Sequence, residues 1–134
     1  MKVAKGDVIP EWVMEAVSAE RMKTMAAILR DPNPLHWNRD TVAALPMGLG
    51  KRTINQGPLG LSYMVNMLHD WAGPGSIKRL KMTFPHVVLD GERVIARGVV
   101  TETTESIAHC EVWLEEASRG RLLVGAAEVD ISQS

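Results

Sequence analysis

The spacing of hydrophobic and polar residues changes near the middle of this 134-residue chain. In the first half, apolar residues recur three and four positions apart, which is the period of a helix with a buried face. In the second half they alternate with polar residues, as in half-buried strands. The pattern therefore predicts a mixed fold in which helices come early and a β-sheet is completed late.

The N-terminal part is predicted to contain one strand, one helix and a less regular segment. Residues 12–17 alternate as a strand, and residues 18–29 follow as a helix with apolar residues on one face. Ser18 is a suitable N-cap for that helix, because its hydroxyl can accept a hydrogen bond from a free backbone N–H group. A short helical or irregular stretch is expected over residues 37–45.

A second helix is predicted to be buried. Gly57 and Pro58 open it, and proline is well tolerated in a first helical turn, where its missing N–H group costs little. Gly73 and Pro74 end it, in the usual order of glycine cap and then proline. Between these signals the helix is apolar nearly all round, which is typical of a helix enclosed by the rest of the fold.

The C-terminal half is predicted to form four antiparallel strands. Turn residues at 90–91 and 118–120 separate the later ones, and the expected strands are 80–84, 94–103, 107–115 and 122–131. A strongly curved antiparallel sheet wrapped around the one apolar helix accounts for the whole order of elements. The predicted class is therefore α+β.

Length and composition limit the choice of function. A chain of 134 residues and 14.7 kDa is expected to be a single domain, residues 1–134. Its core should be large enough to fold without disulfides or a structural metal. The net charge is -1 and there is no long basic run, so we do not expect a nucleic-acid partner. Cys110 is the only cysteine, so it cannot form an internal disulfide, and we expect a buried, inert thiol.

The sequence shows neither a signal-peptide pattern nor a membrane-spanning segment. Residues 1–10 do not contain the apolar run of a signal peptide. No window approaches the roughly 18 uninterrupted apolar residues of a membrane-spanning helix. We therefore expect a cytoplasmic protein without a membrane span.

Residues 31–36 are the main candidate for chemistry. They place the carboxylate of Asp31, the amide of Asn33 and the imidazole of His36 within six positions, and Pro32 and Pro34 stiffen the backbone between them. From the residues alone, two interpretations stay open. One is a structural turn, for which such residues are common. The other is a rigid site that holds one water molecule between two proton-transfer groups.

The same hexapeptide resembles the signature of the MaoC-like hydratases and dehydratases, a hotdog-fold family that includes the (R)-specific enoyl-CoA hydratases. Their signature reads Asp-x-Asn-Pro-[apolar]-His, and residues 31–36 match it without a gap. A family glycine that opens the central helix corresponds to Gly57, and a serine five positions later corresponds to Ser62. The chain departs from the family at Gln56, where most members have histidine.

The resemblance implies a reaction and a set of site residues. The reaction is the reversible syn addition of water to a trans-2-enoyl thioester, which gives an (R)-3-hydroxyacyl thioester. Asp31 is expected to act as the base, while His36 holds the same water and passes the proton. Gly57 is expected to stabilise the enolate-like oxygen through its N–H group, at a helix N-terminus that favours negative charge. Asn33 is expected to orient the turn, and Ser62 either touches the substrate or bonds a carbonyl within the helix.

The resemblance also implies partners and assembly. No metal and no cofactor are expected, because CoA or an acyl-carrier protein enters as the carrier of the substrate in fatty acid or lipid metabolism. A homodimer or higher oligomer is implied, in which the catalytic segment overhangs the sheet, and a heteromeric partner is possible. Residues 70–74 resemble actinobacterial members that act on bulky acyl groups such as steroid side chains. Gly57 and Gly60, which lack side chains one turn apart, are a second reason to expect room for a branched or cyclic acyl group.

Two alternatives stay open beside this hypothesis. A hotdog acyl-CoA thioesterase would need a carboxylate on the central helix, and residues 57–68 contain none. A subunit that only completes a heteromeric hydratase would be expected to lack the acid and the imidazole, which this chain keeps in Asp31 and His36.

Overall fold

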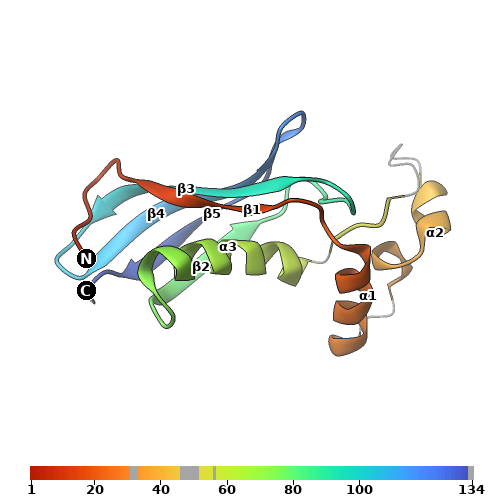
Figure 1. Ribbon diagram of the computed structural model, residues 1–134, viewed down its shortest axis with the longest axis horizontal. Helices are drawn as coiled ribbons and strands as arrows, with labels where there is room; N and C mark the ends of the chain where they lie inside the picture. The colour runs from red at the N-terminus through yellow and green to blue at the C-terminus, as the bar shows by residue number, and fades with distance from the viewer. Residues whose placement is uncertain (31–32, 46–51, 56, 133–134) are drawn as a thin grey trace.

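A single antiparallel sheet dominates the computed structural model, which describes residues 1–30, 33–45, 52–55 and 57–132. Within those residues five strands pair in the order β1-β3-β4-β5-β2 (Figure 1). They are β1 (Val8–Met14), β2 (Ile77–Thr83), β3 (Val94–Thr103), β4 (Ile107–Glu116) and β5 (Gly120–Asp130). Each neighbouring pair is antiparallel, so β1 and β2 are the edges of the sheet.

The helix α3 (Gly57–Ala72) packs along one face of this sheet (Figure 1). The strands alternate between this face and the opposite one, as the predicted period of two requires. On β4, for example, the four alternate residues that face the core are at most 2% exposed: Ala108, Cys110, Val112 and Leu114. The predicted α+β architecture, a sheet packed around one buried helix, is therefore confirmed.

Three shorter helical elements lie together at one end of the sheet. These are α1 (Ala19–Ile28), the 3-10 helix η1 (Pro34–His36) and α2 (Arg39–Ala43) (Figure 1). Ser18 is the N-cap of α1, and its hydroxyl accepts a hydrogen bond from the Arg21 amide at 3.2 Å. The first helix and its cap are therefore where the sequence predicts them.

The start of two strands differs from the prediction. The first strand was expected over residues 12–17 but spans Val8–Met14, and the second begins at Ile77 instead of residue 80. In both, the register with the neighbouring strand shifts near the beginning, which interrupts the alternation that marks a strand in the sequence. Val17 lies outside the sheet, where it exchanges backbone hydrogen bonds with the loop that precedes β3.

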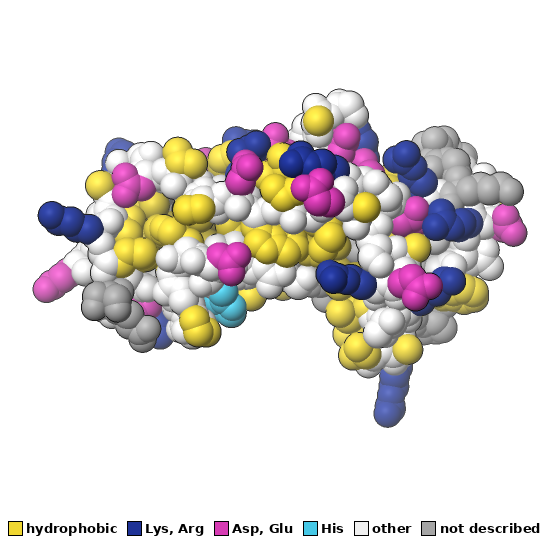
Figure 2. All heavy atoms as spheres, viewed as in Figure 1, with side chains coloured by type: hydrophobic (Ala, Val, Ile, Leu, Met, Phe, Trp, Pro, Cys, Tyr) yellow, Lys and Arg dark blue, Asp and Glu magenta, His cyan; other side chains and the backbone are white. Residues whose placement is uncertain are grey.

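Cys110 and the surface charges agree with the expectations from composition. Burial raises the pKa of the Cys110 thiol to about 11, so the thiol stays protonated and unreactive near neutral pH. Acidic and basic side chains are interspersed over the face drawn in Figure 2, with no continuous patch of one sign. No helix among the described residues is both long and apolar enough to cross a membrane.

Candidate functional site

The turn that carries the family signature is a capped 3-10 helix. Pro34 occupies its first turn, and the Asn33 side chain caps it by accepting a hydrogen bond from the Leu35 amide at 3.1 Å. Asn33 therefore has the side-chain to backbone bond that was expected to orient the turn. Asp31, the expected base, lies outside the described residues.

His36 at the end of this turn is held by a carbonyl group from a distant part of the chain. Its Nδ1 lies 2.7 Å from the Ile54 carbonyl oxygen, and the Ile54 amide donates to the Leu35 carbonyl at 2.8 Å. A carbonyl oxygen can only accept, so Nδ1 carries the proton and donates it. In the neutral ring Nε2 is then the nitrogen with a lone pair, as a group that takes a proton from water requires.

Residues 52–55 join this turn to the loop between β2 and β3. Ile54 forms an isolated β-bridge with Leu89, and the Asn55 amide donates to the Val88 carbonyl at 2.6 Å. The Asp90 amide donates to the Thr53 carbonyl at 2.9 Å. The carbonyl that orients His36 is therefore positioned from both sides, by the turn and by the loop.

Asp90 fixes this segment through its side chain. Its Oδ2 accepts hydrogen bonds of 2.6 Å from both the amide and the hydroxyl of Thr53, and its Oδ1 lies 3.1 Å from the Arg39 guanidinium. Burial alone would raise the pKa of Asp90, but the bonds from Thr53 and the charge of Arg39 outweigh burial and lower the pKa below its ordinary value. Residues 90–91 were predicted only as a turn, and no pattern in the sequence indicates this role of Asp90.

The lowered pKa of Asp90 predicts a stability that falls in acid. Because the unfolded chain binds this proton more tightly than the folded one, the contribution is complete above about pH 4 and is lost as pH falls through the folded-state pKa. We expect Asp90→Asn to reduce the free energy of unfolding by about 1 to 2 kcal/mol at neutral pH. Urea unfolding between neutral and acid pH measures both effects. A variant that kept the acid slope of the parent protein would contradict this assignment.

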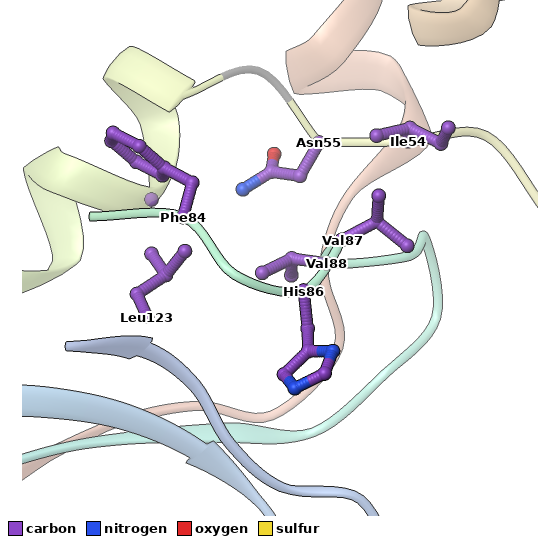
Figure 3. A pocket seen from close by; sticks show the side chains of 8 residues that line it. Ile54, Asn55, Phe84, His86, Val87, Val88 and Leu123 are labelled. Atoms are coloured by element: carbon purple, nitrogen blue, oxygen red, sulfur yellow. The ribbon is translucent and has the colours of Figure 1, made fainter.

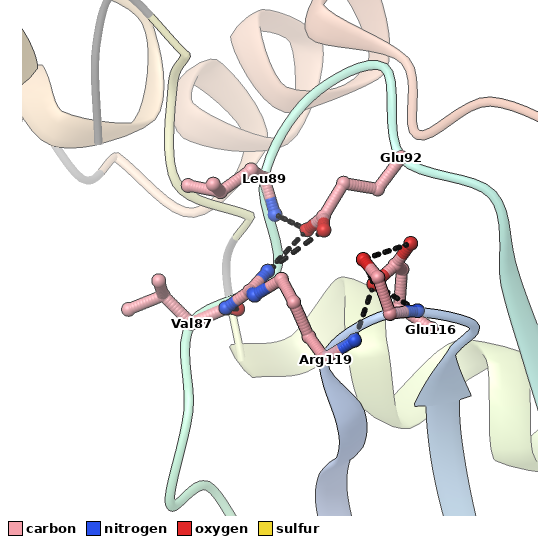
Figure 4. A network of polar contacts seen from close by, with 6 residues as sticks. Val87, Leu89, Glu92, Glu116 and Arg119 are labelled. Atoms are coloured by element: carbon pink, nitrogen blue, oxygen red, sulfur yellow. Dashed lines mark hydrogen bonds and ion pairs between the residues drawn. The ribbon is translucent and has the colours of Figure 1, made fainter. Parts of the chain in front are cut away.

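A second polar network holds the other side of the same loop (Figure 4). Arg119 lies in the turn between β4 and β5, and one of its guanidinium nitrogens contacts both carboxylate oxygens of Glu92, at 2.6 and 2.8 Å. The other donates to the Val87 carbonyl at 2.7 Å, and Glu92 also accepts from the Leu89 amide at 2.8 Å. No local pattern in the sequence indicates this pair, because its members are 27 positions apart.

Gly57 and Ser62, the two residues of α3 that were expected to contact the substrate, lie in its first two turns. Gly57 is the first residue of this 16-residue helix, where backbone N–H groups have no intrahelical partner. The Ser62 hydroxyl donates to the Leu59 carbonyl at 2.6 Å, which is the bond within the helix that was one of its two alternatives. A contact between Ser62 and a substrate stays a prediction.

A cavity of about 190 Å³ opens beside this segment (Figure 3). Most of its wall is apolar, and it is bounded by α3, by β5 and by the loop after β2. The lining residues are Ile54, Asn55, Gly60, Phe84, His86, Val87, Val88 and Leu123. Ile54 lines this cavity and its carbonyl also contacts His36, so the cavity lies next to the signature turn.

Gly60 does not leave the empty space that was expected of it. A Cβ atom at this position would lie 2.7 Å from Cδ1 of Leu123. The Leu123 side chain, from β5, therefore already occupies the space that a side chain at residue 60 would need. Glycine here allows α3 to approach β5 closely. The open space near Gly60 is therefore the neighbouring cavity, which Gly60 and Leu123 both line.

We expect Gly60→Ala to have a small effect on stability. Alanine is favoured in a helix by roughly 1 kcal/mol, which offsets much of the cost of pushing the flexible end of Leu123 aside. Thermal unfolding should therefore change little. The displaced side chain would move toward the cavity, so molecules large enough to fill the cavity should be accepted less well than small ones. An equal effect on large and small substrates would contradict this explanation.

The sheet around one long helix, with a capped His-containing turn at its end, defines a hotdog-type protein. The family model described as MaoC like domain matches residues 10–118, and the chain belongs to this MaoC-like dehydratase family. No curated protein matches the chain in sequence. Among the described residues, no group of three or more His, Cys, Asp or Glu side chains is placed to hold a metal ion.

Solved structures with the same fold include enzymes and complexes. The (R)-hydratase from A. caviae involved in PHA biosynthesis superposes with a TM-score of 0.83 at 24% identity, over 95% of this chain and 96% of that one. The R-hydratase PhaJ1 from Pseudomonas aeruginosa gives 0.82 at 19% identity, over 95% and 81%. The ChsH1–ChsH2 complex from Mycobacterium tuberculosis gives 0.81 at 20% identity, over 96% and 98%.

Proposed function

We propose that this protein catalyses the reversible syn hydration of a trans-2-enoyl thioester to the (R)-3-hydroxyacyl thioester. The proposal is supported by membership of the MaoC-like family and by the likeness to two (R)-hydratases. The observation that carries it is the 2.7 Å contact between His36 Nδ1 and the Ile54 carbonyl. That contact leaves Nε2 as the proton-accepting nitrogen in the turn that carries the family signature.

The proposed reaction needs a water molecule, a base that takes a proton from it, and a group that delivers a proton to C2. The water oxygen forms a bond to C3 of the enoyl group, and one of its protons is taken by the acid–imidazole pair. That proton is then given to C2, so that no proton is gained or lost overall. We assign the base to Asp31 on the signature alone, and His36 orients the same water and passes the proton.

The developing charge on the thioester oxygen needs a hydrogen-bond donor. We assign this role to the backbone N–H of Gly57, because it begins α3, where free N–H groups and the helix dipole favour a negative charge. Glycine also lets the thioester approach closely, since it has no side chain.

The proposal is tested by adding crotonyl-CoA to the purified protein and following the ultraviolet absorbance of the conjugated thioester. Hydration removes the conjugation, so absorbance falls. In the reverse direction, (R)-3-hydroxybutyryl-CoA should be dehydrated and its (S) enantiomer should not. Turnover of the (S) enantiomer at an equal rate would contradict the proposed geometry of addition.

A thioesterase is the weaker candidate on this fold. It would release free CoA, which the proposed hydratase does not, so a thiol reagent in the same assay distinguishes the two reactions. The absence of Asp and Glu from residues 57–68 of the central helix counts against hydrolysis. Asp70, nearer the helix end, is exposed.

We infer that the protein works as an oligomer with the sheet edges as contact regions. The edge strands β1 and β2 each have one side without a neighbouring strand among the described residues. Phe84, which follows β2, is an apolar side chain that is 51% exposed near one of these edges. A heteromeric assembly is the alternative, since complexes occur among the similar structures. The mass of the purified protein in solution, alone and with candidate partners, distinguishes a homodimer from a heteromer.

We infer further that the acyl group is branched or cyclic. An engineered cavity of roughly 150 Å³ is known to accommodate benzene, and the cavity beside Ile54 measures about 190 Å³. An enoyl-CoA whose chain ends in a cyclohexyl ring should therefore react at least as well as crotonyl-CoA. A rate that fell steadily with acyl size would contradict this.

A further inference from the structure

Asn55 is a buried polar residue whose side chain borders the cavity of Figure 3. The residue is 7% exposed, and neither Nδ2 nor Oδ1 of its amide has a partner among the described residues. Its backbone is fixed, because its N–H group donates to the Val88 carbonyl at 2.6 Å. Since a buried amide without partners destabilises the folded state, this group calls for a partner such as a bound water molecule or a ligand.

The Asn55 amide points into the cavity rather than into the packed core. Figure 3 shows it directed into the space between Phe84 and Val88, with Leu123 on the opposite wall. Among the described lining residues His86 is the one with an ionisable side chain, and its ring points away from the amide (Figure 3). The cavity therefore has an apolar wall with one neutral polar group facing into it.

The Tyr63 hydroxyl is an internal polar group close to this amide. Burial raises the pKa of the Tyr63 hydroxyl and the Asn55 amide partly offsets the rise, so the two groups lie near each other. Neither amide atom reaches that hydroxyl with hydrogen-bond geometry. Even one bond to Tyr63 would satisfy only one of the two amide atoms, since an amide has a donor and an acceptor end.

We propose that Asn55 is a specificity-determining residue that binds an oxygen atom on the distal part of the acyl group. The preferred acyl group is then compact, neutral and mostly apolar, about the size of one ring, with a single carbonyl or hydroxyl oxygen. This rests on the proposed hydratase function, because it assigns the cavity to the acyl group of the same substrate. Asn55 follows Ile54, the residue that holds His36, so the cavity lies beside the place where the thioester would react.

The apolar remainder of the wall supports a preference for a neutral group. Val88 and Leu123 are buried, and Gly60 adds no side chain of its own. A charged group would lose its hydration there without gaining an opposite charge, whereas a carbonyl or hydroxyl oxygen needs only the amide. Sites that hydrogen-bond a substrate oxygen discriminate strongly against analogues that lack it, because the protein group is otherwise left unpaired.

The test compares two enoyl-CoA substrates of the same shape. In one substrate the acyl chain ends in a cyclohexanone ring. In the other a methylidene group (=CH2) replaces the ketone oxygen. We expect kcat/KM to be about tenfold higher for the ketone. Asn55→Leu should abolish that preference, while Asn66→Leu, the same change on the exposed side of α3, should keep it.

Thermal unfolding of the ligand-free variants gives a readout that does not depend on activity. Asn55→Leu removes the amide and keeps the branched shape of the side chain beside an open cavity, so its melting temperature should rise by roughly 3 to 5 °C. A lower melting temperature would mean that the amide is already satisfied within the protein, and would overturn the proposal. If the leucine variant does not fold, Asn55→Ala replaces it in the substrate comparison.

Failure of this inference and failure of the proposed function are distinguishable. Equal kcat/KM for both substrates in the parent protein would overturn the role of Asn55 and leave the hydratase function intact. If neither thioester reacts, the side-chain amide resonance of Asn55 is followed on adding cyclohexanone and methylenecyclohexane as small probes. A shift with cyclohexanone alone would support the subsite without the reaction, and no shift with either would overturn it.

Discussion

His36→Asn is expected to lower the rate of enoyl-CoA hydration by about 10²-fold or more while the protein stays folded. Asparagine places an amide near the position of Nδ1, where it can still donate to the Ile54 carbonyl. It removes Nε2, which is the nitrogen that the 2.7 Å contact between Nδ1 and Ile54 leaves for proton transfer. The loss should therefore appear in the chemical step and not in stability.

Crotonyl-CoA turnover and thermal unfolding of the same preparation measure the two parts of this prediction. His109→Asn is the matched control, because His109 lies on β4, where its Nδ1 is 3.9 Å from Glu128 on the neighbouring strand β5. Asp31→Asn should cause a loss of similar size, and Asp70→Asn on the exposed side of α3 is its control. Equal rates for His36→Asn and His109→Asn would remove His36 from the mechanism.

Arg119→Met is expected to reduce the free energy of unfolding by about 3 kcal/mol. Methionine preserves much of the volume but leaves the Glu92 carboxylate, whose side chain is 4% exposed, without its cation. The Val87 carbonyl also loses its donor from Arg119. The cost is large because a charge buried without a partner is far less favourable than one exposed to water.

Adding Glu92→Gln to Arg119→Met should recover part of this loss. The unpaired charge is then gone, while a side-chain oxygen remains to accept from the Leu89 amide. Arg121→Met is the control, because Arg121 pairs with Glu111 at a site where both side chains are 49% exposed, so it should cost less than about 1 kcal/mol. Urea unfolding followed by tryptophan fluorescence measures all three. A loss for Arg119→Met no larger than for Arg121→Met would show that the buried pair does not stabilise the loop.

These two variants also separate chemistry from positioning. His36 belongs to the turn that carries the signature, whereas Arg119 holds the loop that lines the cavity and pairs with residues 53–55. Arg119→Met should therefore alter substrate preference as well as stability. His36→Asn should lower turnover of every substrate alike.

Much of the fold follows from local patterns in the sequence. The period of two in β3, β4 and β5 and the helical period of α1 and α3 depend only on which side chains must avoid water, so they are visible without a structure. Ser18 and Gly73 mark helix ends by their own conformational preferences. The edge strands were less well predicted, because bulges at their beginnings interrupt the alternation.

By itself the sequence determined the class of fold, the buried helix and the signature turn, because each depends on residues that are neighbours along the chain. Only the tertiary structure decided what holds that turn, since the Ile54 carbonyl is 18 positions from His36 and the Asp90 carboxylate is 37 positions from Thr53. It also decided that the space at Gly60 belongs to Leu123 and that the Asn55 amide faces a cavity. Such contacts depend on how distant segments pack together, and no periodicity or local preference encodes them.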